Sequence, residues 1–74
     1  MSTTEVRAEF AAVVFKVLVK VADTVGEGDE VAILESMKME IPVTTPVSGT
    51  VTAVGATAGS AIGDGELIVA ISSD

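Results

Sequence analysis

The stretch Val31-Ala32-Ile33-Leu34-Glu35-Ser36-Met37-Lys38-Met39-Glu40-Ile41-Pro42-Val43 places a lysine between two short apolar runs. The run 31–34 is typical of a buried strand, and the residue before Pro42 is restricted to extended backbone. Of the three lysines in the sequence, only Lys38 therefore falls where a pair of strands must turn back. A lysine amine at a hairpin tip is exposed and free to move, which suits covalent attachment better than packing.

An internal repeat surrounds this stretch. A shift of 37 positions aligns Gly26 with Gly63 and Gly28 with Gly65, and acidic residues flank both pairs. Glycines at fixed offsets indicate the same backbone turns, so each half reads as a strand, a glycine-acid turn and a strand. The junction between the halves falls near Lys38, and we expect this lysine to project from one end of the molecule. The same shift also superposes Val14 on Val51, Val17 on Val54 and Ser36 on Ser73.

The remaining apolar residues favour strands over helices. Val13, Phe15, Val17 and Val19 alternate with the lysines at 16 and 20, as in a half-buried strand. The spacing of three between Val14 and Val17, and between Val51 and Val54, would suit a helix. The Thr/Val content and the glycines at 49 and 55 instead favour strands with a bulge. Pro42 cannot donate to a ladder, so we expect it at a sheet edge or with its nitrogen facing outward.

The sequence therefore predicts an all-β domain of about seven or eight short strands, built from two halves related by an approximate two-fold axis. Neither half has enough apolar surface to be stable alone. We expect residues 1–5 to form an N-terminal tail and residues 6–74 to form the domain.

Composition limits the partners. The chain has 74 residues, enough for one small domain, and 49% of them are hydrophobic. Eleven acids against four bases give a net charge of −7, which repels phosphate backbones and disfavours nucleic-acid binding. No apolar run reaches the length of a membrane span, and residues 1–5 lack the layout of a signal peptide, so we expect a cytoplasmic protein.

The chemistry available to the chain is narrow. It has no cysteine and no histidine, which excludes a serine triad, a thiolate nucleophile and an ordinary zinc site. The acidic stretch 23–30 lacks the alternating ligands of a calcium loop, and we interpret it as a solvated turn. We expect no catalytic residue and no metal, so the protein should not be an enzyme by itself.

Residues 31–40 closely resemble the biotin attachment motif of biotinyl domains. Gly28, the two similar halves and the segment 46–51 also match the layout of that family, and the resemblance covers roughly residues 6–72. It is greatest to the small stand-alone biotin/lipoyl attachment proteins of bacteria. The resemblance implies a flattened β-barrel, or sandwich, of two four-stranded sheets with an internal pseudo-two-fold repeat and with the modified lysine on an exposed hairpin.

Three features depart from the pattern of the family. Ser36 stands where the family usually has alanine. Residues 9–13, Glu-Phe-Ala-Ala-Val, replace a proline-methionine-proline-glycine run, so that Ala12 stands where the second half has Gly49. No thumb-like insertion separates the halves.

The resemblance also implies roles for the residues of the motif. Lys38 would carry biotin, attached by a biotin protein ligase, and Met37 and Met39 would accompany it as recognition residues. The partners would be the biotin carboxylase and carboxyltransferase components of a carboxylase, between which the biotin carries carboxyl groups. Weaker ligase contacts are expected from Glu35, Ser36 and Glu40.

Two other functions stay open at this point. Lipoyl domains share the fold but typically carry an acid directly before the lysine, where this chain has Met37. A compact acidic β-domain could also act as an interaction scaffold with Lys38 unmodified.

Overall fold

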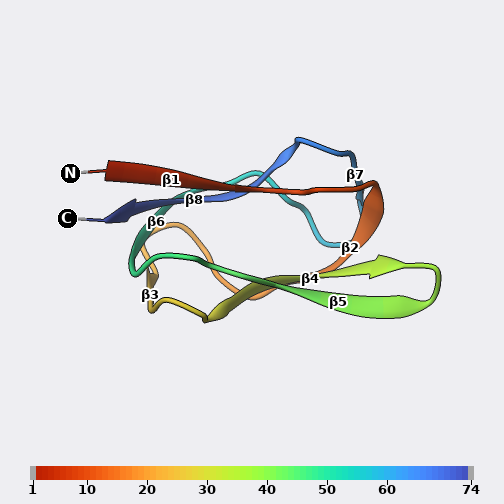
Figure 1. Ribbon diagram of the computed structural model, residues 1–74, viewed down its shortest axis with the longest axis horizontal. Coiled ribbons are helices and arrows are strands. Elements are labelled where there is room, and N and C mark those ends of the chain that lie inside the picture. Colours follow the sequence, from red (N-terminus) through yellow and green to blue (C-terminus); the bar gives the residue numbers. More distant parts are fainter. Residues whose placement is uncertain (1, 74) are drawn as a thin grey trace.

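The computed structural model describes residues 2–73, which form eight β-strands and no helix (Figure 1). This confirms the predicted all-β class. None of the described residues belongs to a helix that could cross a membrane. The strands are β1 (Ser2–Arg7), β2 (Ala12–Val17), β3 (Thr24–Val25), β4 (Glu30–Ser36), β5 (Met39–Thr44), β6 (Gly49–Val54), β7 (Ala61–Ile62) and β8 (Leu67–Ser73).

The strands form two four-stranded antiparallel sheets. One has the order β1-β8-β6-β3 and the other the order β5-β4-β2-β7. Each sheet contains two strands from residues 2–36 and two from residues 39–73, so the halves of the chain interlock rather than forming separate layers. This arrangement is the predicted sandwich of two four-stranded sheets.

The predicted repeat accounts for the whole topology. Adding 37 to the bounds of β1, β2, β3 and β4 gives the bounds of β5, β6, β7 and β8. The same addition turns the strand order of one sheet into that of the other. The two halves are therefore copies of one unit, and the two residues that separate them are Met37 and Lys38.

The bulges repeat as well. The β2–β4 register shifts between Val14 and Lys16, and the β6–β8 register shifts between Val51 and Ala53. The extra residue is Phe15 in the first half and Thr52 in the second. These positions confirm the bulges predicted from the valine spacing. A bulge bends its strand and redirects side chains.

The core between the sheets is aliphatic. Its largest fully buried apolar side chains come from both halves, and each is 2% exposed or less. Burying one such side chain stabilises the fold by roughly 1.5–3 kcal/mol, so the core depends on both halves being present. These side chains are Val14, Val31, Leu34, Val51, Ile68, Val69 and Ile71.

The glycine-acid turns are closed by their own carboxylates. The backbone N–H of Gly26 donates to Asp29 Oδ2 over 2.8 Å, and that of Gly63 donates to Glu66 Oε1 over 2.6 Å. Within the stretch 23–30, expected to be a solvated turn, Thr24–Val25 instead forms β3 against β6, and Val25 is buried. Two acids of this stretch, Asp23 and Asp29, therefore serve local structure, since each accepts a hydrogen bond from a backbone N–H.

The N-terminal residues differ from expectation. Ser2 to Glu5, predicted to be part of a tail, belong to β1 and pair with β8 from Ser73 to Ala70. They are polar, and they become a strand because β1 occupies the place that β5 occupies in the other half. Met1 and Asp74 lie outside the described residues.

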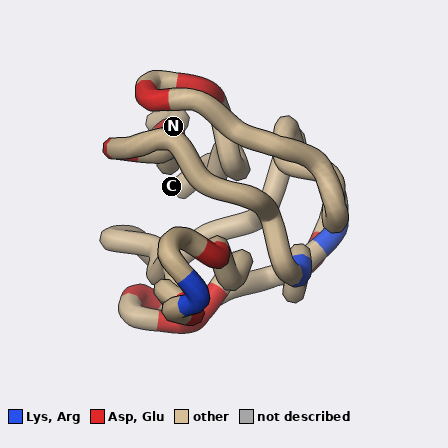
Figure 2. The backbone as a smooth tube through the Cα atoms, turned by 90° about the vertical axis from the view of Figure 1, so that its right-hand side faces the viewer, with Lys and Arg blue, Asp and Glu red and all other residues tan. Residues whose placement is uncertain are grey.

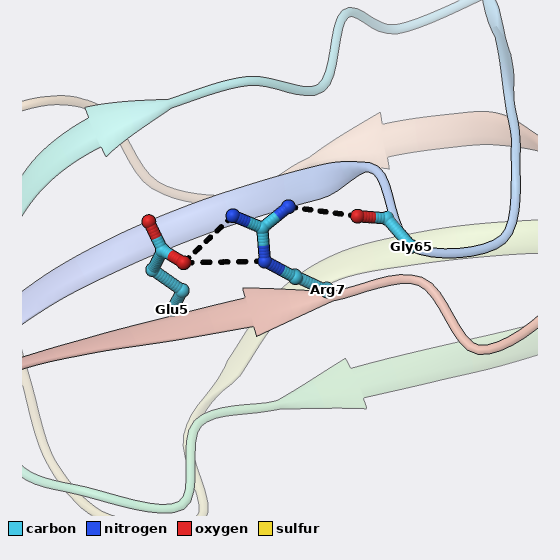
Figure 3. Close-up of polar contacts among 3 residues, drawn as sticks. All are labelled: Glu5, Arg7 and Gly65. Carbon is cyan, nitrogen blue, oxygen red and sulfur yellow. Dashed lines mark hydrogen bonds and ion pairs between the residues drawn. The ribbon is translucent and has the colours of Figure 1, made fainter.

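A surface guanidinium secures the end of β1 (Figure 3). Arg7 donates to Glu5 Oε1 over 2.7 Å and to the carbonyl oxygen of Gly65 over 2.7 Å. Because the Arg7–Glu5 pair is about half exposed, it contributes little more than about 1 kcal/mol. Its main effect is to hold β1 against the loop that precedes β8.

The hairpin of β4 and β5 lies at the opposite end of the molecule from the two termini (Figure 1). Ser36 pairs with Met39 at the hairpin, and Ser73 pairs with Ser2 at the other end, as the repeat requires. The molecule is elongated, with principal extents of 37 × 18 × 17 Å. Lys38 therefore sits at one extremity, as predicted.

One position breaks the repeat in a way that costs stability. Ala22 has φ 81° in a turn whose copy in the second half has Gly59 at φ 88°. Replacing Ala22 by glycine should raise the free energy of unfolding by about 0.5–1 kcal/mol, because glycine adopts this conformation without the clash of a Cβ atom. Urea denaturation measures the change.

Gly59→Ala is the matched control. A Cβ at Gly59 would meet no atom within 4 Å, so its cost isolates the backbone conformation. It should lower the free energy of unfolding by about 1 kcal/mol. Equal stability of Ala22→Gly and the parent protein would show that the turn is not strained.

Candidate functional site

The hairpin at the end of the molecule is closed by a two-residue turn. Ser36 pairs with Met39, and the residues between them, Met37 and Lys38, have φ of 53° and 65°. Positive φ at both central positions defines a type I′ turn, whose twist matches that of the two strands. The lysine is thus held at the apex by the backbone itself.

The turn is made from residues that are poorly suited to it. Asn and Gly dominate type I′ turns, because a Cβ atom makes the left-handed conformation costly by roughly 1–2 kcal/mol per residue. Met37 and Lys38 have no such advantage, and the rest of the fold must maintain their conformation. Strained positions of this kind cluster at functional sites.

The side chains of the turn are exposed. Met37 is 91% and Met39 is 65% exposed, although isolated methionines usually pack in cores. Lys38 is exposed too, and it takes part in no salt bridge or side-chain hydrogen bond among residues 2–73. Its amine is therefore free to react or to be enclosed by another protein.

Two acids flank the turn. Glu35 of β4 lies directly opposite Glu40 of β5, and both are exposed. Like charges directly opposite on neighbouring strands are unfavourable, so this pair does not serve the hairpin's stability. Ser36 is half-buried beside them, and its partner across the ladder is Met39.

The cleft of the molecule lies away from the lysine. Between the edge strands β1 and β5 is a cleft of about 470 Å³, whose lining includes the buried Leu34 and Ile68. None of the residues 35–40 lines it. No three acidic side chains within the described part of the chain come close enough to hold a metal ion. The candidate site is consequently an exposed protrusion outside this cleft.

Comparison with known proteins assigns this arrangement to a family. Residues 3–71 match the biotin/lipoyl family described as "Biotin-requiring enzyme". The chain belongs to this family. The match covers nearly all of both halves, including the lysine hairpin.

Individual relatives are similar over most of the chain. It is 48% identical to the biotinylated protein TB7.3 homolog of Mycobacterium leprae over 68 residues, which are 92% of this chain and 96% of that protein. It is 41% identical to the human mitochondrial propionyl-CoA carboxylase alpha chain over 63 residues, 85% of this chain but 9% of that protein.

A solved structure agrees with the fold. The Kluyveromyces lactis urea carboxylase superposes with a TM-score of 0.87 at 29% identity, over 97% of this chain and 6% of that one. The chain thus spans only a small part of the carboxylases it matches. The similarity to them extends to one small β-domain within a much larger protein.

The sequence placed the lysine correctly but not the conformation of its turn. No Asn or Gly marks positions 37 and 38, so nothing in the residue types signals a left-handed turn. The cleft between β1 and β5 also had no signal, because most of β1, Ser2 to Glu5, was expected to be a tail. Pro42 does lie in an edge strand, β5, as predicted.

Relieving the turn should stabilise the unmodified protein. We expect Lys38→Gly to raise the free energy of unfolding by about 0.5–1 kcal/mol, because glycine adopts the φ of 65° without strain. Lys16→Gly, in the middle of β2, should instead lower it by about 0.5–1 kcal/mol. Thermal or urea unfolding of both variants tests the strain; a destabilised Lys38→Gly would contradict it.

Proposed function

We propose that the protein is a biotin carboxyl carrier in which Lys38 is the attachment residue. A separate biotin protein ligase would join the ε-nitrogen of Lys38 to the carboxyl carbon of an activated biotin. The bond from that carbon to its activating group would break, and the activating group and a proton of the amine would leave. When attached, biotin accepts a carboxyl group in one active site and yields it in another. The domain contributes no catalytic group of its own and serves a biotin-dependent carboxylase.

One observation supports this proposal most strongly: Lys38, within the stretch matched by the family, is held out at the apex of a left-handed turn with no side-chain partner in the described structure. The site fits the group, because no side-chain contact or cleft encloses the amine. The amine must lose its proton to attack an acyl group, and the exposed Glu35 and Glu40 are the nearest acids along the chain. The ligase would therefore supply the environment for that step.

The rigid domain and the exposed side chain of Lys38 have different roles. Interlocked sheets fix the place of the hairpin, and the methylenes of Lys38 allow movement from there. A short flexible tether keeps its end at an effective concentration of about millimolar at each site. We place the protein in the cytoplasm, where ATP for the ligase and the carboxylase is available.

Lipoate is the second candidate group. Met37 occupies the position before the lysine, and the matched M. leprae relative is named as a biotinylated protein. Both observations favour biotin over lipoate. An unmodified scaffold role would leave the strain at Met37 and Lys38 without a purpose.

The attachment residue is tested by intact-mass measurement after co-expression with a biotin protein ligase. We expect one biotinyl addition in the parent protein and none in Lys38→Arg, because a guanidinium is not a usable nucleophile. Lys16→Arg and Lys20→Arg are matched controls, and each should still carry one biotinyl group. Modification that persists in Lys38→Arg would refute the assignment.

Met37 is tested by exchange for an acid. We expect Met37→Asp to slow biotinylation by about tenfold or more, which corresponds to roughly 1.4 kcal/mol of lost recognition. Aspartate tolerates the left-handed conformation, so the hairpin should keep its shape. An unchanged ligase rate would show that Met37 is not a recognition residue.

A further inference from the structure

The exposed large apolar side chains are distributed unevenly between the two halves. All of those among the described residues lie between positions 10 and 39, and the second copy of the unit contributes only its first residue, Met39. Two of them, Met37 and Met39, belong to the hairpin. The others follow β2 and its flanking segments: Phe10, Val13, Phe15, Leu18 and Val21.

The repeat provides an internal control for this asymmetry. Val13, Phe15 and Leu18, which we call the β2 strip, are 45%, 43% and 45% exposed. The equivalent positions of the second half are Thr50, Thr52 and Gly55, also exposed. Because the strand, the bulge and the register are the same in both halves, the fold does not require apolar residues there.

The β2 strip is continuous with the hairpin. Val13 pairs with Glu35, and Glu35 pairs with Glu40, so one row of the sheet joins the strip to the acids beside the lysine. The next row, Val14–Leu34–Ile41, includes the buried Val14 and Leu34, and the row after it joins Lys16 to Ile33 and Pro42. The strip thus extends along the body of the domain, starting from the row that flanks the hairpin.

The strip contains the bulge of β2. Phe15 is the extra residue of the bulge, and both it and Lys16 are exposed. The Lys16 ammonium lies 5.5 Å from the centroid of the Phe15 ring. The copy of this bulge presents Thr52, whose hydroxyl donates to the Ala70 carbonyl oxygen over 3.3 Å. The equivalent bulges therefore expose an aromatic ring only on the sheet that contains β4 and β5, the strands of the lysine hairpin.

The charged residues around the β2 strip indicate which charges the surface of a docking partner would carry. Glu35 and Glu40 lie at the hairpin end, and Lys16 lies beside Phe15. Basic segments are few and acidic ones more extensive when the domain is seen from the hairpin end (Figure 2). A second copy would bring another net charge of −7 against these carboxylates, which disfavours self-association.

We propose that the β2 strip, bordered by Glu35 and Glu40, is the surface on which a biotin carboxylase holds the body of the carrier. This inference rests on the proposed function and names the docking partner of the same site. The covering surface would be apolar, with a basic side chain facing the two glutamates and an acidic one facing Lys16. An aromatic anchor in such a patch is typical of residues that dominate binding energy.

The placement of the strip favours a carboxylase over the ligase. A ligase acts once, on the amine at the apex. The biotin carboxylase must hold the domain while the biotin at the end of the Lys38 side chain is carboxylated. Tethering helps only if the body of the domain stays within reach of the active site. Contacts along β2, away from Lys38, provide such a hold without obstructing the arm.

The test uses the biotinylated chain as substrate for the biotin carboxylase of the source organism. The rate of bicarbonate-dependent ATP hydrolysis is measured as the concentration of the carrier is varied. Val13→Thr/Phe15→Thr takes both residues from the second half, where the same backbone accepts them. We expect about a tenfold higher KM for the carrier, an unchanged kcat, and an unchanged rate of biotinylation by the ligase. Phe15→Thr alone should give a smaller increase, and urea unfolding confirms that each variant is folded.

Thr50→Val/Thr52→Phe is the matched control, because it makes the reverse exchange on the other sheet. It should leave the KM unchanged. An unchanged KM in Val13→Thr/Phe15→Thr, an equal increase in the control, or a loss of ligase rate in place of the KM effect would overturn the docking surface. A parent chain that is biotinylated but not carboxylated would refute the carrier function itself, and is recognised before any variant is compared.

Discussion

The pairing of the central strands β4 and β8 with strands from both halves is the constraint on which the rest of the structure depends. β4 lies between β2 and β5, and β8 lies between β1 and β6, so each half completes the sheet of the other. Leu34 and Ile71, equivalent residues of these two strands, are both buried in the common core. Because every sheet needs both copies, the two residues between the copies must make a turn, and that turn presents Lys38.

The turn at Met37 and Lys38 has features that serve function and not the stability of the fold. Met37 and Lys38 adopt positive φ without an Asn or a Gly, and Glu35 faces Glu40 across the ladder. Neither feature stabilises the domain. Both leave an exposed amine that another protein can enclose, and the cleft between β1 and β5 lies elsewhere. A rigid body with a reactive extremity is what a carrier needs, since the chemistry takes place on the attached group and in the partner's active site.

Most of the architecture could be predicted because the signals were local and duplicated. Gly26 and Gly63, each closed by an acid three residues on, fixed equivalent turns, and the valine spacing revealed both bulges. The failures concern segments shaped by distant pairing. Ser2 to Glu5 have no apolar alternation and form a strand only because β8 needs a second partner, and β3 is defined by its ladder to β6. The turn conformation of Lys38 likewise depends on the register of β4 and β5.

The central claim is that the ε-amine of Lys38, and no other amine of the chain, receives the cofactor. Peptide mapping by tandem mass spectrometry, on protein isolated from its native host, tests it most directly. We expect biotin on the peptide that contains Met37-Lys38-Met39 and unmodified lysine at positions 16 and 20. Lipoate on Lys38, biotin on another residue, or protein that is functional with Lys38 entirely unmodified would contradict it.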